Sequence, residues 1–103
     1  MWNRIRNLRI MELPVNYNKT PPAQRKLVRE EYIRQQGGKC YYCKKPLIMS
    51  PSKEVLDKKI NWKLFPPNFL QHPHHLHHSH DTGMTIGTVH AYCNAVLWQY
   101  HGE

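Results

Sequence analysis

Acidic side chains are scarce in this sequence, which has 7 Asp and Glu residues against 15 Lys and Arg residues. The formal net charge is therefore +8 and the pI is near 9.6. A charge balance of this sign favours a polyanionic partner such as nucleic acid, although it says nothing about the fold. A basic surface that is merely soluble is the alternative interpretation of the same numbers.

Cysteine and long apolar runs are scarce as well. Three cysteines are an odd number, which argues against a framework of disulfides and favours a reducing compartment. No stretch approaches the roughly 20 apolar residues that span a bilayer. Residues 1–15 carry scattered arginines and lack an apolar core of signal-peptide length. We therefore expect a cytoplasmic protein with no membrane partner.

A chain of 103 residues with 40% hydrophobic and 21% charged residues predicts one small globular domain. Its core would be modest, and chains this short often depend on a metal. We divide it into a basic arm at 1–20 and a domain at 21–103. The arginines of the arm would contact phosphate or belong to a segment packed on the domain, and these are Arg4, Arg6 and Arg9.

Local signals predict an α+β fold. Thr20 followed by two prolines is typical of an N-cap, and it predicts a basic helix that runs to about Gln36 and stops at Gly37-Gly38. Residues 50–70 predict an irregular connection with a helical turn near 52–60. The last third predicts a strand at 74–79, a turn at 81–83, a strand at 85–89 and a helix at 91–101.

Two pairs of metal-ligand residues share a two-residue gap. They are Cys40-x-x-Cys43 and His90-x-x-Cys93, and together they make a Cys3His set that suits structural zinc. A thioredoxin-like redox pair is the rival interpretation of the first motif, but it requires a strand before it and a helix after it. Lys44-Lys45-Pro46 does not begin a helix well, so the spacing favours a zinc knuckle.

With these motifs the sequence resembles the HNH (ββα-metal) nucleases, most closely the recombination endonuclease VII type of phages. The family has C-x-x-C first, then L-x-V-D-H-D-H-x-T-G, then C-x-x-C-N at the start of the final helix. Counted back from Cys93-Asn94, the chain fits this pattern without a gap. His77 stands at the first aspartate, His78 at the catalytic histidine, His80 at the second histidine and Asn94 at the asparagine.

The resemblance implies a small zinc-stabilised ββα-metal (HNH, or His-Me finger) domain preceded by a basic helix. His77 and Asn94 would hold one divalent ion, His78 would be the general base, and His80 would orient the phosphate or assist the base. Histidine in place of aspartate at His77 favours Mn²⁺ or another divalent transition metal and puts Mg²⁺ in question. Histidines outside this pattern are interpreted as surface residues, namely His72, His74, His75 and His101.

The expected function is metal-dependent DNA endonuclease activity, with nicking or double-strand cutting, in the host cytoplasm if the chain is phage-encoded. A zinc-stabilised module that binds nucleic acid without cutting it is the alternative, because charge and zinc ligands fit both. Resolvases of this family are dimers, whereas this chain ends at Glu103 without a downstream helical region. Monomer and homodimer therefore both stay open.

Overall fold

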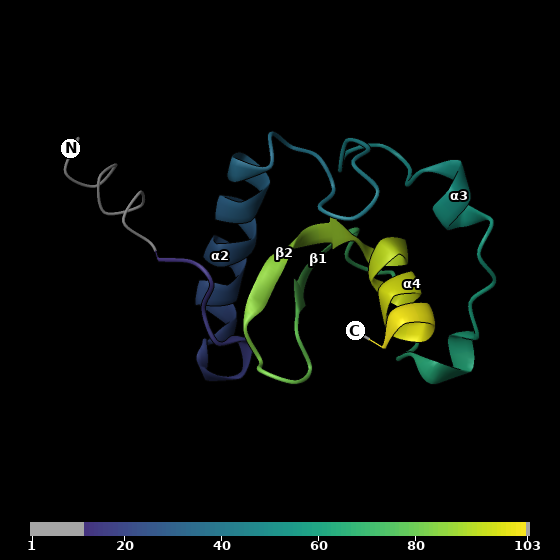
Figure 1. Ribbon diagram of the computed structural model, residues 1–103. Helices are drawn as coiled ribbons and strands as arrows, with labels where there is room; N and C mark the ends of the chain where they lie inside the picture. The colour runs from purple at the N-terminus through teal and green to yellow at the C-terminus, as the bar shows by residue number, and fades with distance from the viewer. Residues whose placement is uncertain (1–11, 103) are drawn as a thin grey trace.

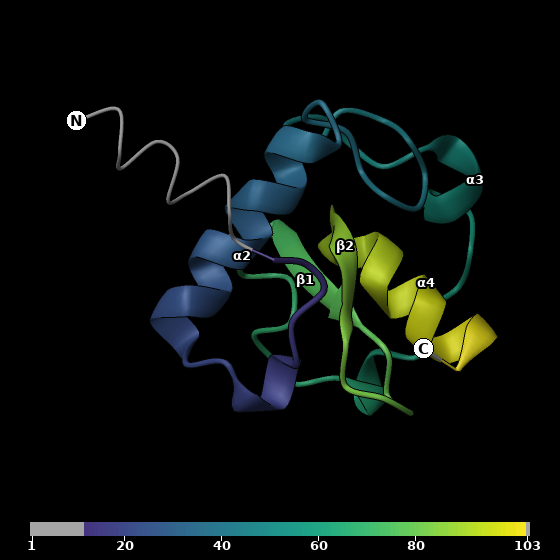
Figure 2. The same cartoon turned by 60° about the vertical axis from the view of Figure 1, so that its left-hand side comes forward.

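The computed structural model describes residues 12–102 of the chain. Over this range the protein is a small mixed α+β fold with one two-stranded antiparallel sheet, and the hairpin lies between helices α2 and α4 (Figure 1, Figure 2). The elements in chain order are η1 (Tyr17–Lys19), α2 (Pro22–Gln35), α3 (Lys53–Leu56), η2 (Trp62–Leu64), β1 (His74–His78), β2 (Thr85–His90) and α4 (Ala91–His101). None of the helices described is long and apolar enough to cross a bilayer.

The start of α2 differs from the expectation, and its end agrees with it. Thr20 is not the N-cap, because Pro21 occupies that position and makes no side-chain capping bond. The Thr20 hydroxyl instead donates to the carbonyl of Asn16 at 2.6 Å. The helix can begin without a side-chain cap since its first residue is a proline, which has no N–H to satisfy. Gly37 and Gly38 then leave the helix with φ of 66° and 77°, conformations that suit glycine.

The hairpin of β1 and β2 confirms the two expected strands to within one residue at each end. Leu76 packs with Val28 and Tyr32 of α2, so this side of the hairpin faces α2. Val89, opposite His75, packs with core residues of α4 on the other side. The register shifts between His77 and His78, because β2 has one extra residue, Ile86, between the partners of these two histidines.

The segment before α2 lies across the hairpin. Val15 and Thr85 exchange hydrogen bonds, with the Thr85 N–H donating to the Val15 carbonyl at 2.9 Å. The Tyr17 N–H donates to the Gly83 carbonyl at 2.7 Å. The described part of the expected arm is therefore packed on the domain. Its arginines Arg4, Arg6 and Arg9 lie outside the described residues.

A close approach joins the end of α2 and the first cysteine motif to β2. The Gln36 side chain bonds to both the N–H and the carbonyl of Thr88 at 2.9 Å, and the Tyr41 N–H donates to the same carbonyl at 2.9 Å. Gly87 permits this contact, since a Cβ there would lie 2.9 Å from Gln36 Oε1 and from Tyr41 Cγ. The contact brings the first cysteine pair next to the C-terminal end of β2, where the second ligand pair begins.

Candidate functional site

The expected zinc ligands form one cluster. Their ligand atoms all lie within 4.8 Å of one another, and the four residues are Cys40, Cys43, His90 and Cys93. His90 Nδ1 is 3.5 Å from Cys43 Sγ and 3.6 Å from Cys93 Sγ. A tetrahedral zinc ion with ordinary bond lengths separates such atoms by about 3.6 Å. The structure therefore confirms a Cys3His cluster that could hold a structural metal such as zinc.

The first motif is a tight turn of the knuckle type. The N–H groups of Tyr42 and Cys43 lie 3.3 Å and 3.5 Å from Cys40 Sγ and donate to it. Lys44 closes the turn with φ of 69°, and the Cys40 N–H donates to the Lys45 carbonyl at 2.8 Å. Backbone donors aimed at sulfur stabilise a thiolate, and no helix follows the second cysteine directly within the described range. This geometry favours metal binding over a redox pair.

The second nitrogen of His90 is already occupied. His90 Nε2 lies 2.8 Å from the Met49 carbonyl and 3.0 Å from the Pro46 carbonyl, so its N–H donates to the backbone. The tautomer is thereby fixed with a lone pair on Nδ1, the atom that faces the sulfurs. Metal-bound histidines are commonly oriented by such a second contact. The donor set fits zinc in its chemistry as well as in its spacing.

The electrostatics of the cysteines also point to a cation. The Cys93 thiol donates to Cys40 and lowers the pKa of Cys40 to about 4, despite partial burial. The pKa of Cys93 is raised, first by that same hydrogen bond and then by burial. The pair therefore shares one negative charge when no cation is bound. A divalent ion would supply the positive charge that lets all the ligating thiols ionise.

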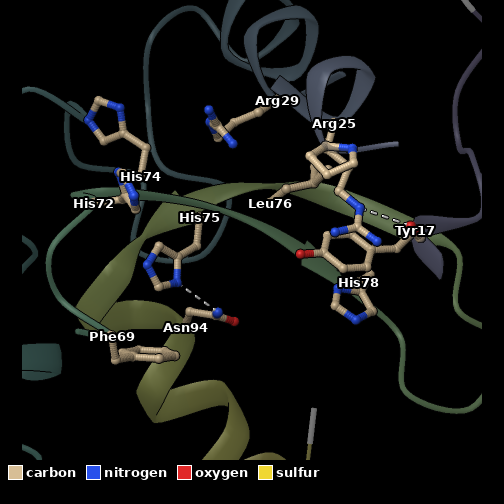
Figure 3. A pocket seen from close by; sticks show the side chains of 11 residues that line it. Tyr17, Arg25, Arg29, Phe69, His72, His74, His75, Leu76, His78 and Asn94 are labelled. Atoms are coloured by element: carbon tan, nitrogen blue, oxygen red, sulfur yellow. Dashed lines mark hydrogen bonds between the residues drawn. The ribbon is translucent and has the colours of Figure 1, made fainter. Parts of the chain in front are cut away.

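A separate cavity of about 400 Å³ lies along the free edge of β1 (Figure 3). It is bordered by α2 on one side and by the first turn of α4 on the other. The polar residues used below are Arg25 and Arg29 from α2, His75 and His78 from β1, and Asn94 from α4. No aspartate or glutamate is among the described residues that line the cavity. Its lining is cationic and suited to an anion.

Two predicted site residues line this cavity. Both His78 and Asn94 line it, although they belong to different elements. His78 Nδ1 and Asn94 Oδ1 are buried and have no hydrogen-bond partner within residues 12–102. Buried polar atoms rarely remain unpaired, so each indicates a missing partner. Imidazole nitrogen and amide oxygen are both ligands of divalent metals, and these donors fit the expected ion.

The other two predicted residues lie beside the cavity. His77 is 3% exposed, pairs with Gly87 across the hairpin and is absent from the lining. Its role as a metal ligand stays a prediction. His80 is exposed, with its ring centroid 3.8 Å from that of Trp98 and 5.2 Å from that of His78. It is therefore close to the expected base.

Tyr17, which the sequence did not single out, stacks on His78, and Arg25 of the expected basic helix stacks on Tyr17 in turn. The Tyr17 ring stacks on the His78 ring with centroids 3.9 Å apart and planes 8° from parallel. The Arg25 guanidinium carbon is 4.0 Å from the Tyr17 ring centroid, and Arg25 Nε donates to the Tyr17 carbonyl at 3.1 Å (Figure 3). Local sequence contains no signal for this stack, because it depends on how the segment before α2 crosses the hairpin.

Burial lowers the pKa of His78 below its ordinary value of 6.5. The charges of His80, His77 and Arg25 act in the same direction, while a hydrogen bond to the Leu76 backbone opposes them. His78 is consequently neutral near pH 7, which is the form that can accept a proton.

His75 is a third residue that sequence reasoning missed, since it was taken as a surface histidine. Its Nδ1 lies 3.1 Å from Asn94 Nδ2. One signal could have found it: His75 precedes His77 by two positions in a strand, so the two share a face.

Comparison with protein-family models, curated proteins and solved structures finds no match for this chain. The fold and the site define a small mixed α+β protein with a Cys3His cluster that could hold a metal ion and a cationic cavity beside it. Any more specific function has to be argued from the geometry of this cavity.

Proposed function

We propose that this protein is a metal-dependent DNA endonuclease of the HNH (ββα-metal) type. One observation carries the proposal. His78 and Asn94, each with a buried polar atom that has no hydrogen-bond partner among the described residues, line one cavity that two arginines also line and to which no described carboxylate contributes. A general base, a metal-binding oxygen and positive charge for a phosphate are what metal-assisted phosphodiester hydrolysis requires.

The arrangement of the elements supports the same proposal. A strand, a strand and a helix follow one another directly, and the Cys3His cluster joins the first cysteine turn to the start of α4. Asn94 comes immediately after the last ligand, Cys93, in the first turn of α4. A zinc ion in the cluster would therefore hold Asn94 at the cavity as well as stabilise the fold.

The arginines supply the contact with substrate. Arg25 and Arg29 are one helical turn apart, about 6 Å along the axis of α2, and both face the cavity. Neither forms a salt bridge with a carboxylate among the described residues. No described carboxylate neutralises their charge, and guanidinium groups bind phosphate in a bidentate geometry. With a net charge of +8, the substrate is a nucleic acid strand, which we propose to be DNA.

His78 would accept a proton from the water that attacks the phosphorus. Its lowered pKa keeps the ring neutral, and Tyr17 holds the ring in one plane. Asn94, with His77 as the second proposed ligand, would bind a divalent ion, and when bound such an ion offsets the negative charge that develops on the phosphate. His80, beside His78, would orient the phosphate or assist the base.

The test is cleavage of supercoiled plasmid with Mn²⁺, Co²⁺, Ni²⁺ or Mg²⁺ by the unmutated chain, His78→Ala and a control, His101→Ala. The His101 ring contacts Tyr42 and is not part of the cavity lining. We expect His78→Ala to lose on the order of 10²- to 10⁴-fold in rate. Zinc content, melting temperature and DNA affinity should not change.

If the unmutated chain binds DNA but nicks it with none of these ions, the protein is a zinc-stabilised binding module. If His78→Ala cuts as fast as its parent, the base is assigned to the wrong histidine, and His80 is the next to replace.

A further inference from the structure

The amide of Asn94 has two unlike ends. The oxygen Oδ1 can bind a cation, whereas the nitrogen Nδ2 carries hydrogens and cannot. In the structure Nδ2 is 3.1 Å from His75 Nδ1, and Oδ1 is buried without a hydrogen-bond partner in the described part of the chain. Figure 3 shows the nitrogen turned toward His75 and the oxygen on the side away from it. The amide thus has its nitrogen on His75 and its oxygen turned away from that contact.

His75 is built to be an acceptor at this contact. Its ring lies edge-on to Phe69, with centroids 4.6 Å apart, on the edge of the cavity. A neutral imidazole has one N–H and one lone pair. Asn94 Nδ2 can only donate, so in this contact the lone pair of His75 is on Nδ1.

We infer that His75 is the positioning residue that sets the orientation of the Asn94 amide and so presents Oδ1 to the divalent ion. The opposite orientation would place Oδ1 against the lone pair of His75 and turn the N–H₂ group toward the cation. Both contacts would be repulsive. The inference rests on the proposed function, because the ion is that of the proposed nuclease site.

Mn²⁺ binding to the zinc-loaded chain, without DNA, tests this role apart from catalysis. Free Mn²⁺ can be followed by electron paramagnetic resonance during a titration. We expect His75→Ala to weaken binding by about 10- to 100-fold, as is usual when a residue that orients a ligand is lost. His75→Gln should retain most of the affinity, because its side-chain oxygen can accept the same hydrogen bond.

Asn94→Asp provides the matched background. A carboxylate has oxygen at both ends, so nothing remains to be oriented. We expect His75→Ala to have little effect on Mn²⁺ affinity when combined with Asn94→Asp. A His75 that served only as packing would cost the same in both backgrounds. Zinc content and melting curves check the fold of every variant, and His75→Leu replaces His75→Ala if the alanine variant does not fold.

The outcomes separate the inference from the proposal beneath it. If Asn94→Ala loses Mn²⁺ while His75→Ala binds it as tightly as the unmutated chain, His75 does not orient the amide and the ion site stands. An equal cost of His75→Ala in the Asn94→Asp background would likewise overturn the orienting role alone. If Asn94→Ala binds Mn²⁺ with unchanged affinity, Asn94 is no ligand, and both the orienting role and the proposed ion site are overturned.

Discussion

Tyr17 lies flat against His78, with ring centroids 3.9 Å apart and planes only 8° from parallel. The two residues are far apart in the chain, and their contact joins the segment before α2 to the end of β1. Stacking fixes the plane of the ring but leaves its nitrogens free for chemistry. Tyr17 thus holds the proposed base in place without using either of its nitrogens.

Replacement of Tyr17 by leucine should slow DNA cleavage, because leucine fills space without stacking. A misplacement of about 1 Å can cost on the order of 10²-fold in rate, so we expect a loss of about 10- to 100-fold in kcat. Tyr17→Phe keeps the ring and should retain most of the activity. Plasmid nicking rates at equal zinc content measure the difference. Equal rates for the two variants would contradict a role for the stack.

The pH profile of cleavage should show a base that stays neutral to unusually low pH. His78 acts as an acceptor only when unprotonated, and burial lowers its pKa from 6.5. The rate should therefore fall as the pH drops through a midpoint below 6.5, and it should be level near pH 7. Arg25→Gln removes one of the charges that lower this pKa, so its midpoint should move upward. An unmutated midpoint above 6.5 would contradict the assignment of His78.

Removal of zinc should unfold the domain. The cluster joins the cysteine turn to α4 in a chain with a small core, and structural zinc commonly contributes on the order of 10 kcal/mol to folding. Metal analysis should find about one zinc per chain, and Cys43→Ala or a strong chelator should abolish cooperative melting. Cys43→His keeps a zinc-binding Cys2His2 set and serves as the control. An unchanged melting temperature without zinc would show that the cluster is not structural.

Transition metals should support cleavage at least as well as Mg²⁺. The described residues that line the cavity include several imidazoles and no carboxylate, whereas Mg²⁺ prefers oxygen ligands. His77→Asp should shift the preference toward Mg²⁺ if His77 is a ligand, as we propose. Cleavage rates with Mn²⁺ and Mg²⁺ in both proteins give the ratio. Strict dependence on Mg²⁺ in the unmutated protein would exclude His77 from the ligand set.

DNA affinity should depend on salt through the cavity arginines. Arg29→Ala should reduce the slope of log K against log salt by about 0.9, the value for one lost phosphate contact. Arg34→Ala is the matched control on the same helix, since Arg34 Nε is bound to Glu31 Oε1 at 3.1 Å. Filter binding over a range of salt concentrations measures both slopes. A larger effect from Arg34 would place the DNA on another face of α2.

The elements and the Cys3His cluster could be predicted because their signals are local. Two ligands separated by two residues fall on one turn. The motifs Cys40-x-x-Cys43 and His90-x-x-Cys93 could therefore be recognised from the sequence alone. Prolines and glycines mark the ends of α2, and the pattern of the last third predicted β1, β2 and α4 to within a residue. The Thr20 cap failed because proline made it unnecessary.

The cavity and its contacts were decided by tertiary packing. The contact of His75 with Asn94 and that of Tyr17 with His78 join residues far apart in the chain. Spacing along the chain can identify which residues are chemically able to form a site. Only the packing of α2, the hairpin and α4 selects which of them meet, because that choice depends on contacts between segments distant in sequence.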